Sequence, residues 1–240
     1  MRMKVEVMVP NKFTNRKRNS NMELIRVILS DENLKEGLKG VLDKLTEDVT
    51  IKAVLDMETD KGKEMAGFLA VIASLSGRIT LEAYAPEEGE KAEGLNQDYL
   101  PAAGFYKDGA WSGIAFHGVP GGQEINSFVL ALYNLAGPGQ DISRWTRKKI
   151  EKLTGKVNIK ICVSLACHHC PKVVTACQHM AALNEGIEAE MIDANLYPEL
   201  VDKYKIQRVP MTILNDEEIV MGVKTIEEMA DIVKKLTKKK

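Results

Sequence analysis

The chain has 240 residues, of which 45% are apolar and 28% charged, and this composition is typical of a globular protein with one large or two small domains. The formal net charge of -1 excludes an overall basic field that would attract nucleic acid or an anionic membrane surface. No apolar run approaches the ~20 residues that a membrane span needs. The longest run, residues 65–75, is expected to be a core helix.

The first 21 residues differ from the rest of the chain. They are rich in Lys and Arg and lack a continuous apolar centre, so we do not expect a secretory signal. Residues 3–10 could form a strand, but the composition favours a disordered extension or a non-native start over residues 1–21. The fold is then expected to begin near Met22.

All four cysteines lie in one short stretch, residues 162–177. A secreted domain held by disulfides would spread its cysteines along the chain, so this clustering indicates one redox pair and two bystanders. The bystanders, Cys162 and Cys177, are predicted to be small buried core residues. The pattern therefore favours a cytoplasmic protein.

The chain contains an internal repeat. Residues 44–52 align with residues 152–160 without a gap, and the match continues through the next helix and strand. Each copy is predicted to run helix, strand, turn, helix, strand. The opening helices follow Asp31 and Asp141, which are both suitable N-cap residues.

The later part of each copy is predicted to be a hairpin and a closing helix. The expected elements are strands 101–106 and 111–116 with helix 124–135, and strands 210–214 and 218–221 with helix 225–236. Gly137-Pro138-Gly139 marks the join. The sequence thus predicts an α/β protein of two tandem folds, residues 22–139 and 140–240, each with a mixed sheet flanked by helices.

Two cysteines in the second copy form a C-x-x-C motif at a predicted strand-to-helix turn. Cys167 and Cys170 follow the apolar run 157–163 and precede a segment, 172–183, with helical spacing. This arrangement resembles a thioredoxin-like redox site. A sulfur at a helix N-terminus is favoured as thiolate, and the second sulfur one turn on can close an exchangeable disulfide.

The neighbours of the motif suggest a role for each residue. Cys167 is predicted to be the exposed nucleophile and Cys170 the buried resolving thiol. His168 and His169 are candidates for stabilising the thiolate, and the residues between the cysteines tune the redox poise. Pro171 suits the first turn of a helix, where a missing N–H costs little.

The first copy has no such motif. The repeat alignment places Thr59 at the position of Cys167 and Gly62 at the position of Cys170. The first copy is therefore expected to be a redox-inactive duplicate with a structural or recognition role.

Two further positions follow from the likeness to a thioredoxin fold. Pro210 opens an apolar run, where that fold has a cis-proline facing the disulfide, and the backbone of Val209 can then pair with a substrate chain. Thioredoxins place a buried aspartate six residues before the first cysteine, whereas this chain has Ile161. Glu124 is our candidate for the missing proton acceptor. A helix-start glutamate that only satisfies the helix dipole is an equally good explanation.

Blander interpretations of the motif stay open. Cys167 and Cys170 could be ordinary buried cysteines, or the Cys-His-His-Cys run could bind zinc. Zinc sites usually take a second ligand pair from a distant knuckle, and the sequence contains none. We therefore expect no metal.

With tandem thioredoxin folds of which only one carries Cys-His-His-Cys-Pro, the chain resembles the N-terminal domain of the flavoprotein subunit of alkyl hydroperoxide reductase. The stretches that carry the resemblance are residues 165–174, 208–210 and 122–132. It covers roughly residues 22–236. The motif usual in that family is Cys-His-Asn-Cys, so His169 is a departure that bears on the redox poise.

The resemblance implies a function. In that family the domain takes electrons from a flavoprotein module that uses NADH or NADPH and delivers them to a peroxiredoxin disulfide. No Gly-x-Gly-x-x-Gly follows, so we expect neither flavin nor nicotinamide on this chain, only the redox-active disulfide Cys167–Cys170. The expected partners are a separate thioredoxin-reductase-like flavoprotein and a peroxiredoxin or other disulfide-containing protein.

The alternatives to this relay are a general protein disulfide reductase or isomerase, related to the tandem protein disulfide oxidoreductases, a non-catalytic binding scaffold, or a metal-binding module.

Overall fold

A computed structural model describes residues 30–238, so the predicted extension and the predicted start near Met22 lie outside the described residues. The first half comprises α2 (Glu32–Leu42), β1 (Val49–Val54), α3 (Asp60–Ser74), β2 (Ile79–Tyr84), the 3-10 helix η1 (Pro86–Lys91), β3 (Ala102–Lys107), β4 (Ala110–His117), the 3-10 helix η2 (Gly122–Glu124) and α4 (Ile125–Ala136). The second half comprises α5 (Arg144–Glu151), β5 (Val157–Val163), α6 (Cys170–Leu183), β6 (Ile187–Asp193), α7 (Pro198–Tyr204), β7 (Met211–Leu214), β8 (Glu218–Met221) and α8 (Ile226–Lys238).

The predicted fold class is confirmed, because each half has the β-α-β unit, the hairpin and the closing helix that the repeat indicates. The two mixed sheets are in addition continuous. Their strands form one eight-stranded sheet of order β2-β1-β3-β4-β6-β5-β7-β8. The halves join where β4 pairs in parallel with β6, from Ile114 opposite Ala189 to His117 opposite Ile192.

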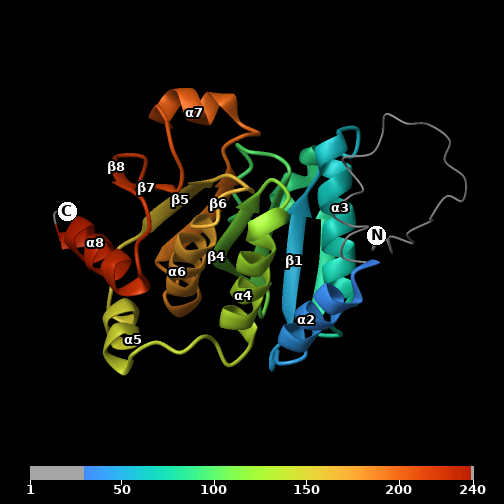
Figure 1. The fold of residues 1–240 in the computed structure, drawn as a ribbon, viewed down its shortest axis with the longest axis horizontal. Coiled ribbons are helices and arrows are strands. Elements are labelled where there is room, and N and C mark those ends of the chain that lie inside the picture. The colour runs from blue at the N-terminus through green and yellow to red at the C-terminus, as the bar shows by residue number, and fades with distance from the viewer. Residues whose placement is uncertain (1–29, 239–240) are drawn as a thin grey trace, which may run out of the picture.

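Six helices cover one face of this sheet (Figure 1). Along β5, Ile159, Ile161 and Val163 point into this main core, as the two-residue period of a strand requires. At its centre Phe128 of α4 packs against Phe116, with ring centroids 4.8 Å apart. The closing helix α4 also packs against α6, so the helical layer crosses the join between the halves.

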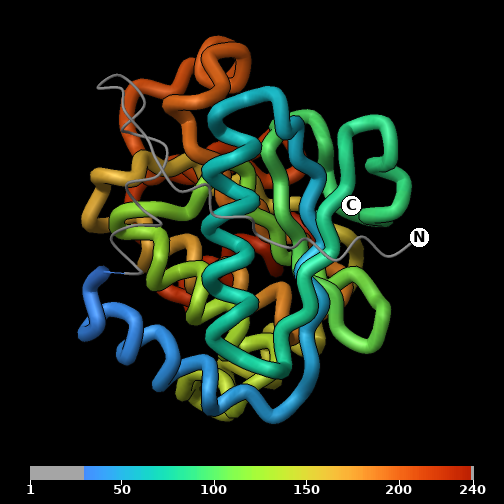
Figure 2. The backbone as a smooth tube through the Cα atoms, turned by 90° about the vertical axis from the view of Figure 1, so that its right-hand side faces the viewer, coloured from blue at the N-terminus to red at the C-terminus, as the bar shows by residue number. Residues whose placement is uncertain are grey.

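The opposite face of the sheet is covered by shorter segments. A small apolar cluster there includes Cys162 of β5 and lies against Leu200 and Tyr204 of α7. A second cluster includes Ala92 and Leu95, which follow η1. Figure 2 shows α2 and α3 on one side of the strands and the η1 region projecting on the other. Neither η1 nor α7 was predicted from the sequence.

The helix starts test the predicted capping residues. Asp31 caps α2, because its carboxylate accepts a hydrogen bond from the Leu34 N–H at 3.1 Å. The prediction for Asp141 is wrong. Ser143 caps α5 instead, because its hydroxyl accepts the Thr146 N–H at 3.0 Å. Across residues 30–238, none of the helices is both long and apolar enough to span a membrane.

A buried polar cluster ties the two halves together beside the β4–β6 pairing. The Nε2 of His117 lies 2.9 Å from a carboxylate oxygen of Glu190, and its Nδ1 lies 2.9 Å from the Tyr99 carbonyl oxygen. Glu190 also accepts hydrogen bonds from Asn96 of the first half and Asn158 of the second. Burial alone would raise the pKa of Glu190, but these hydrogen bonds and the charge of His117 lower it to about 2.

Candidate active site

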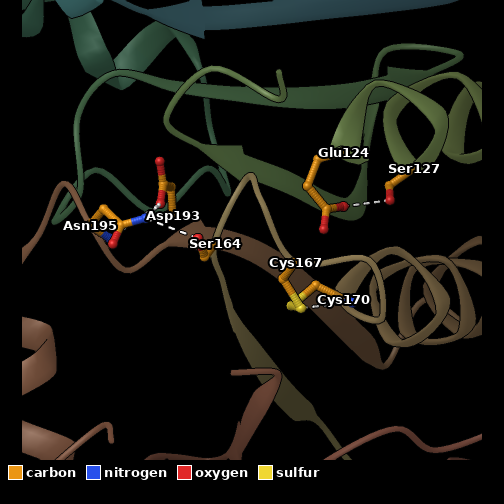
Figure 3. The surroundings of a disulfide bond; sticks show 7 residues. All are labelled: Glu124, Ser127, Ser164, Cys167, Cys170, Asp193 and Asn195. Carbon is orange, nitrogen blue, oxygen red and sulfur yellow. Dashed lines mark hydrogen bonds between the residues drawn. A yellow bond between two sulfur atoms is a disulfide. The ribbon is translucent and has the colours of Figure 1, made fainter. Parts of the chain in front are cut away.

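Cys167 and Cys170 form a disulfide at the turn between β5 and α6 (Figure 3). Cys170 is the first residue of α6 and is fully buried, whereas Cys167 is half-buried. The Cys170 N–H donates to the Cys167 Sγ at 3.2 Å. A backbone donor and the helix N-terminus therefore both favour a thiolate on Cys167 in the reduced protein.

The other residues of the motif lie on the surface of this turn. His168 and His169 are both exposed. His169 is the N-cap residue of α6, yet its side chain makes no capping hydrogen bond. Pro171 lies in the first turn of α6, where its missing N–H leaves no backbone acceptor unsatisfied.

Val209 and Pro210 lie beside the end of β5. The peptide bond between them is cis, and Pro210 is buried. The next residue, Met211, pairs with Cys162 of β5, which places Pro210 at the end of the sheet where the disulfide turn begins. The Gly222 N–H donates to the Pro210 carbonyl at 3.0 Å, so the segment after β8 lies alongside.

That segment gives this edge an apolar rim. Met221 and Val223 expose about two fifths of their surface, at 41% and 40%. Val209 is half-buried between the main core and the cluster under α7. The rim beside Pro210 therefore offers apolar side chains to an incoming polypeptide.

Glu124 reaches this site from the first half. It is fully buried, and one carboxylate oxygen accepts the Ser127 hydroxyl at 2.5 Å while the other has no hydrogen-bond partner among the described residues. Glu124 is the N-cap residue of α4, although its side chain makes no capping hydrogen bond, so the structure does not exclude the helix-dipole interpretation. Figure 3 shows its carboxyl group extending toward the turn that carries the disulfide.

Backbone contacts hold Glu124 in this place. The Gln123 N–H donates to the Leu165 carbonyl in the disulfide turn at 3.2 Å. Gly122 has φ +55°, and a Cβ there would lie 2.6 Å from the same carbonyl oxygen, so only glycine allows this approach. Burial raises the pKa of Glu124 to about 7, with the Ser127 hydrogen bond opposing and the charge of Asp193 adding to the rise.

Asp193 is a site residue that the sequence reasoning missed. It ends β6, is buried, and accepts hydrogen bonds from the backbone and side chain of Asn195, both at 3.1 Å. Asn195 also donates to Ser164 of the disulfide turn at 3.3 Å (Figure 3). Burial raises the pKa of Asp193. The available signal was an acidic residue at the end of a predicted strand, directly after Met191 and Ile192.

The first half carries a modified copy of the same turn. Thr59 caps α3, and its hydroxyl accepts the Gly62 N–H at 3.0 Å. A Cβ on Gly62 would lie 1.9 Å from the Asp56 carbonyl oxygen, so no side chain fits at the position equivalent to Cys170. We call residues 30–136 the silent half and residues 144–238 the active half.

The structure also describes the two remaining cysteines and the side chains that could bind a metal. Cys162 and Cys177 are buried free thiols, and burial raises the pKa of each to about 12. Among residues 30–238, no cluster of three or more His, Cys, Asp or Glu side chains has the geometry to hold a metal ion.

Comparisons with known proteins agree with this architecture. Residues 157–234 match the sequence family described as a thioredoxin domain. A crystal structure of the NTD N/C domain of alkylhydroperoxide reductase from Enterococcus faecalis is 38% identical, with a TM-score of 0.80 over 84% of this chain and 98% of that chain. A protein disulfide oxidoreductase from Aeropyrum pernix is 21% identical with a TM-score of 0.75 over 88% of this chain and 94% of that one, a likeness of fold.

Full-length relatives are longer. The F subunit of alkyl hydroperoxide reductase of Pseudomonas aeruginosa is 33% identical over 83% of this chain and 36% of its own length. A Bacillus subtilis protein named NADH dehydrogenase is 33% identical over 83% of this chain and 37% of its own length. The chain thus spans little more than a third of these relatives.

The fold and the disulfide define a thioredoxin-fold oxidoreductase that works by dithiol–disulfide exchange. More narrowly, the chain belongs to the family of the N-terminal domain of the alkyl hydroperoxide reductase F subunit.

Proposed function

We propose that this protein relays electrons from an NAD(P)H-dependent, thioredoxin-reductase-like flavoprotein to the disulfide of a peroxiredoxin. The observation that carries the proposal is the Cys167–Cys170 disulfide at the start of α6, with Cys167 half-buried and Cys170 fully buried. Relatives named as the F subunit of alkyl hydroperoxide reductase support the choice of partners. The buried free thiols Cys162 and Cys177 suit a reducing compartment, so we place the protein in the cytoplasm.

The exchange proceeds in two steps. The Cys167 thiolate attacks one sulfur of the acceptor disulfide, forming a mixed disulfide and releasing the other acceptor sulfur as a thiolate, which takes a proton. Cys170 then loses its proton and attacks Cys167, which releases the second acceptor thiol. Two electrons and two protons pass to the acceptor, and Cys167–Cys170 is left oxidised. The flavoprotein dithiol reverses these steps to restore the reduced form.

Glu124 is the proposed proton acceptor for the second step. Cys170 is fully buried, so its proton needs a nearby base that water does not supply. Glu124 has one carboxylate oxygen without a hydrogen-bond partner within residues 30–238 and a pKa of about 7, so both of its protonation states are populated at neutral pH. His168 and His169 are proposed to adjust the reduction potential of the Cys167–Cys170 disulfide from the protein surface, because both are exposed and follow Cys167 in the chain.

The apolar rim is the proposed docking surface for the disulfide partner. Val209 would pair through its backbone with an extended partner segment, and Met221 and Val223 would contact its side chains. This mode fits a carrier that exchanges partners, because backbone pairing is tolerant of sequence.

The relay is tested by a coupled assay that follows peroxide-dependent NAD(P)H oxidation. The mixture contains this protein, a thioredoxin-reductase-like flavoprotein, NAD(P)H and a peroxiredoxin, and each component is omitted in turn. We expect oxidation to stop when this protein is left out and to return in proportion to the amount added.

Three outcomes would contradict the proposal. Peroxide reduction that needs no contribution from this protein would remove the relay. A Cys167–Cys170 pair that does not cycle between oxidising and reducing buffers would indicate a binding scaffold instead. Reduction of insulin disulfides without any peroxiredoxin-linked activity would indicate a general disulfide reductase.

A further inference from the structure

A basic groove lies between α5 and α8. Its hollow has a volume of about 330 Å³. We call it the Trp145 groove, and its lining is Trp145, Lys148, Lys149, Lys152, Leu153, Thr154, Lys234, Thr237 and Lys238. It contains five lysines and no acidic side chain.

The charge of this groove is poorly balanced within the described chain. Lys149 is buried and donates to Asp231 at 2.6 Å. The other four lysines of the lining form no ion pair within residues 30–238, and all four are exposed. Like charges held this close repel one another, so the cluster favours an anionic ligand from outside.

Trp145 adds an apolar element to the same surface. It is 67% exposed, and the Lys149 ammonium lies 4.0 Å from its ring centroid. Lys149 also donates a hydrogen bond to Asp231, so its position is fixed. One side of the indole therefore contacts a fixed cation, while most of the indole surface is exposed to solvent. An exposed tryptophan in a groove lined by lysines has the composition of an interaction hot spot.

The groove is remote from the disulfide. Leu153 and Thr154 precede β5, whereas Cys167 follows it, and the seven residues of β5 span roughly 20 Å at about 3.3 Å per residue. In Figure 1, α5 lies at the lower end of the sheet and α7 above the other end. A ligand in the groove therefore leaves the redox turn and its apolar rim free.

We propose that the Trp145 groove docks an acidic polypeptide segment of a protein partner, with carboxylates on the lysines and an apolar residue on the indole. The lining comes from both α5 and α8 and places cations around an exposed indole, a combination that matches an acidic segment with an apolar residue. Such a segment would hold its owner on the active half while the disulfide remains available. The inference concerns binding alone and stands apart from the proposed relay.

The test measures binding of a short fluorescein-labelled peptide, made of glutamates around two central leucines, by fluorescence anisotropy. We expect saturable binding that weakens steeply with added salt and is absent for the same peptide with glutamine in place of glutamate. The variant Lys148→Glu with Lys234→Glu, one change on each helix, should bind at least about tenfold more weakly. Trp145→Ala should bind about fivefold more weakly.

The matched control reverses two exposed lysines of the silent half, Lys44→Glu with Lys63→Glu, and should bind like the unchanged protein. Insulin reduction should be equal in all variants, which separates docking from the redox chemistry. Equal weakening by the control pair would show non-specific attraction and overturn the proposal. Displacement by tripolyphosphate at equal ionic strength, with no effect of Trp145→Ala, would reveal a small-anion site and also overturn it.

Discussion

The same helix start is built twice in this molecule, once around sulfur and once around oxygen. In the active half the Cys170 N–H donates to the Cys167 Sγ at 3.2 Å, and in the silent half the Gly62 N–H donates to the Thr59 Oγ1 at 3.0 Å. The donor and the acceptor occupy equivalent places in the repeat. The turn geometry alone therefore provides no redox chemistry. That chemistry depends on whether the atom that accepts the hydrogen bond is sulfur or oxygen.

The two halves differ further at the position of the second cysteine, which is Cys170 in the active half and Gly62 in the silent half. Cys170 is buried with room for its sulfur, whereas the Asp56 carbonyl lies where a Cβ on Gly62 would be. At this position the silent half lacks the space for a resolving cysteine as well as the cysteine itself. Contacts of the silent half cross the join, where the Gln123 N–H donates to the Leu165 carbonyl of the disulfide turn and His117 contacts Glu190.

Replacing the nucleophile should give the largest effect. Cys167→Ser should reduce insulin disulfides at background level, a loss of at least about hundredfold. Cys170→Ser keeps the nucleophile but cannot resolve the mixed disulfide, so a covalent adduct with the partner should accumulate on a non-reducing gel. Full activity of the Cys167→Ser protein would mean that the active half is not where exchange occurs.

Restoring a thiol in the silent half should fail for a steric reason. Gly62→Cys places a Cβ against the Asp56 carbonyl, so the free energy of unfolding in urea should fall by about 3 kcal/mol or more. Gly40→Cys on α2 is the matched control, because nothing lies within 4 Å of a Cβ there. Equal stability of the two variants would show that the silent turn can still accommodate a redox pair.

The contact between His117 and Glu190, which links the two halves, should make the free energy of unfolding depend on pH in acid. Glu190 has a folded pKa of about 2, below the unfolded value of about 4.3, so its stabilisation is complete above the unfolded value and is lost as the pH falls through 2. Glu190→Gln should cost about 3 kcal/mol at pH 7, because His117 then lacks its carboxylate.

The same substitution should also flatten the pH dependence of stability between about 4.5 and 2. Urea unfolding at a series of pH values measures both effects, and Glu217→Gln, at an exposed position, is the control. An unchanged acid slope in Glu190→Gln would assign the acid sensitivity to another carboxylate.

Substitutions at Glu124 and Ser127 of the silent half should have a smaller effect on the rate of insulin reduction than loss of Cys167. Glu124→Gln cannot accept the Cys170 proton, so insulin reduction at pH 8 should slow by about tenfold and its inflection near pH 7 should vanish. Ser127→Ala removes a hydrogen bond that lowers the pKa of Glu124, so the inflection should move to higher pH. An unshifted profile in both variants would remove Glu124 from the reaction.

The sequence predicts the parts of this arrangement that spacing encodes. The repeat shows in matched apolar and turn positions, and the C-x-x-C motif in two cysteines before a helical segment. The continuous sheet was not predictable, because nothing in β4 or β6 specifies which strand edge each will meet. The one local sign was His117 and Glu190, polar residues within buried strands, and a sequence does not say that they pair. Asp141 and Ser143 are both residue types that cap helices well, so residue type alone does not decide between them.

The smallest expected effect separates capping from catalysis. Thr59→Ala removes the side-chain oxygen that accepts the Gly62 N–H, so the free energy of unfolding should fall by about 1 kcal/mol, while Thr59→Ser should keep it. Insulin reduction should be unchanged in both variants, because the silent turn has no thiol. A loss of activity in Thr59→Ala with normal stability would mean that the silent turn takes part in exchange. If activity is unchanged, an oxygen at this turn only holds a helix, and the sulfur of Cys167 in the same place is what adds the chemistry.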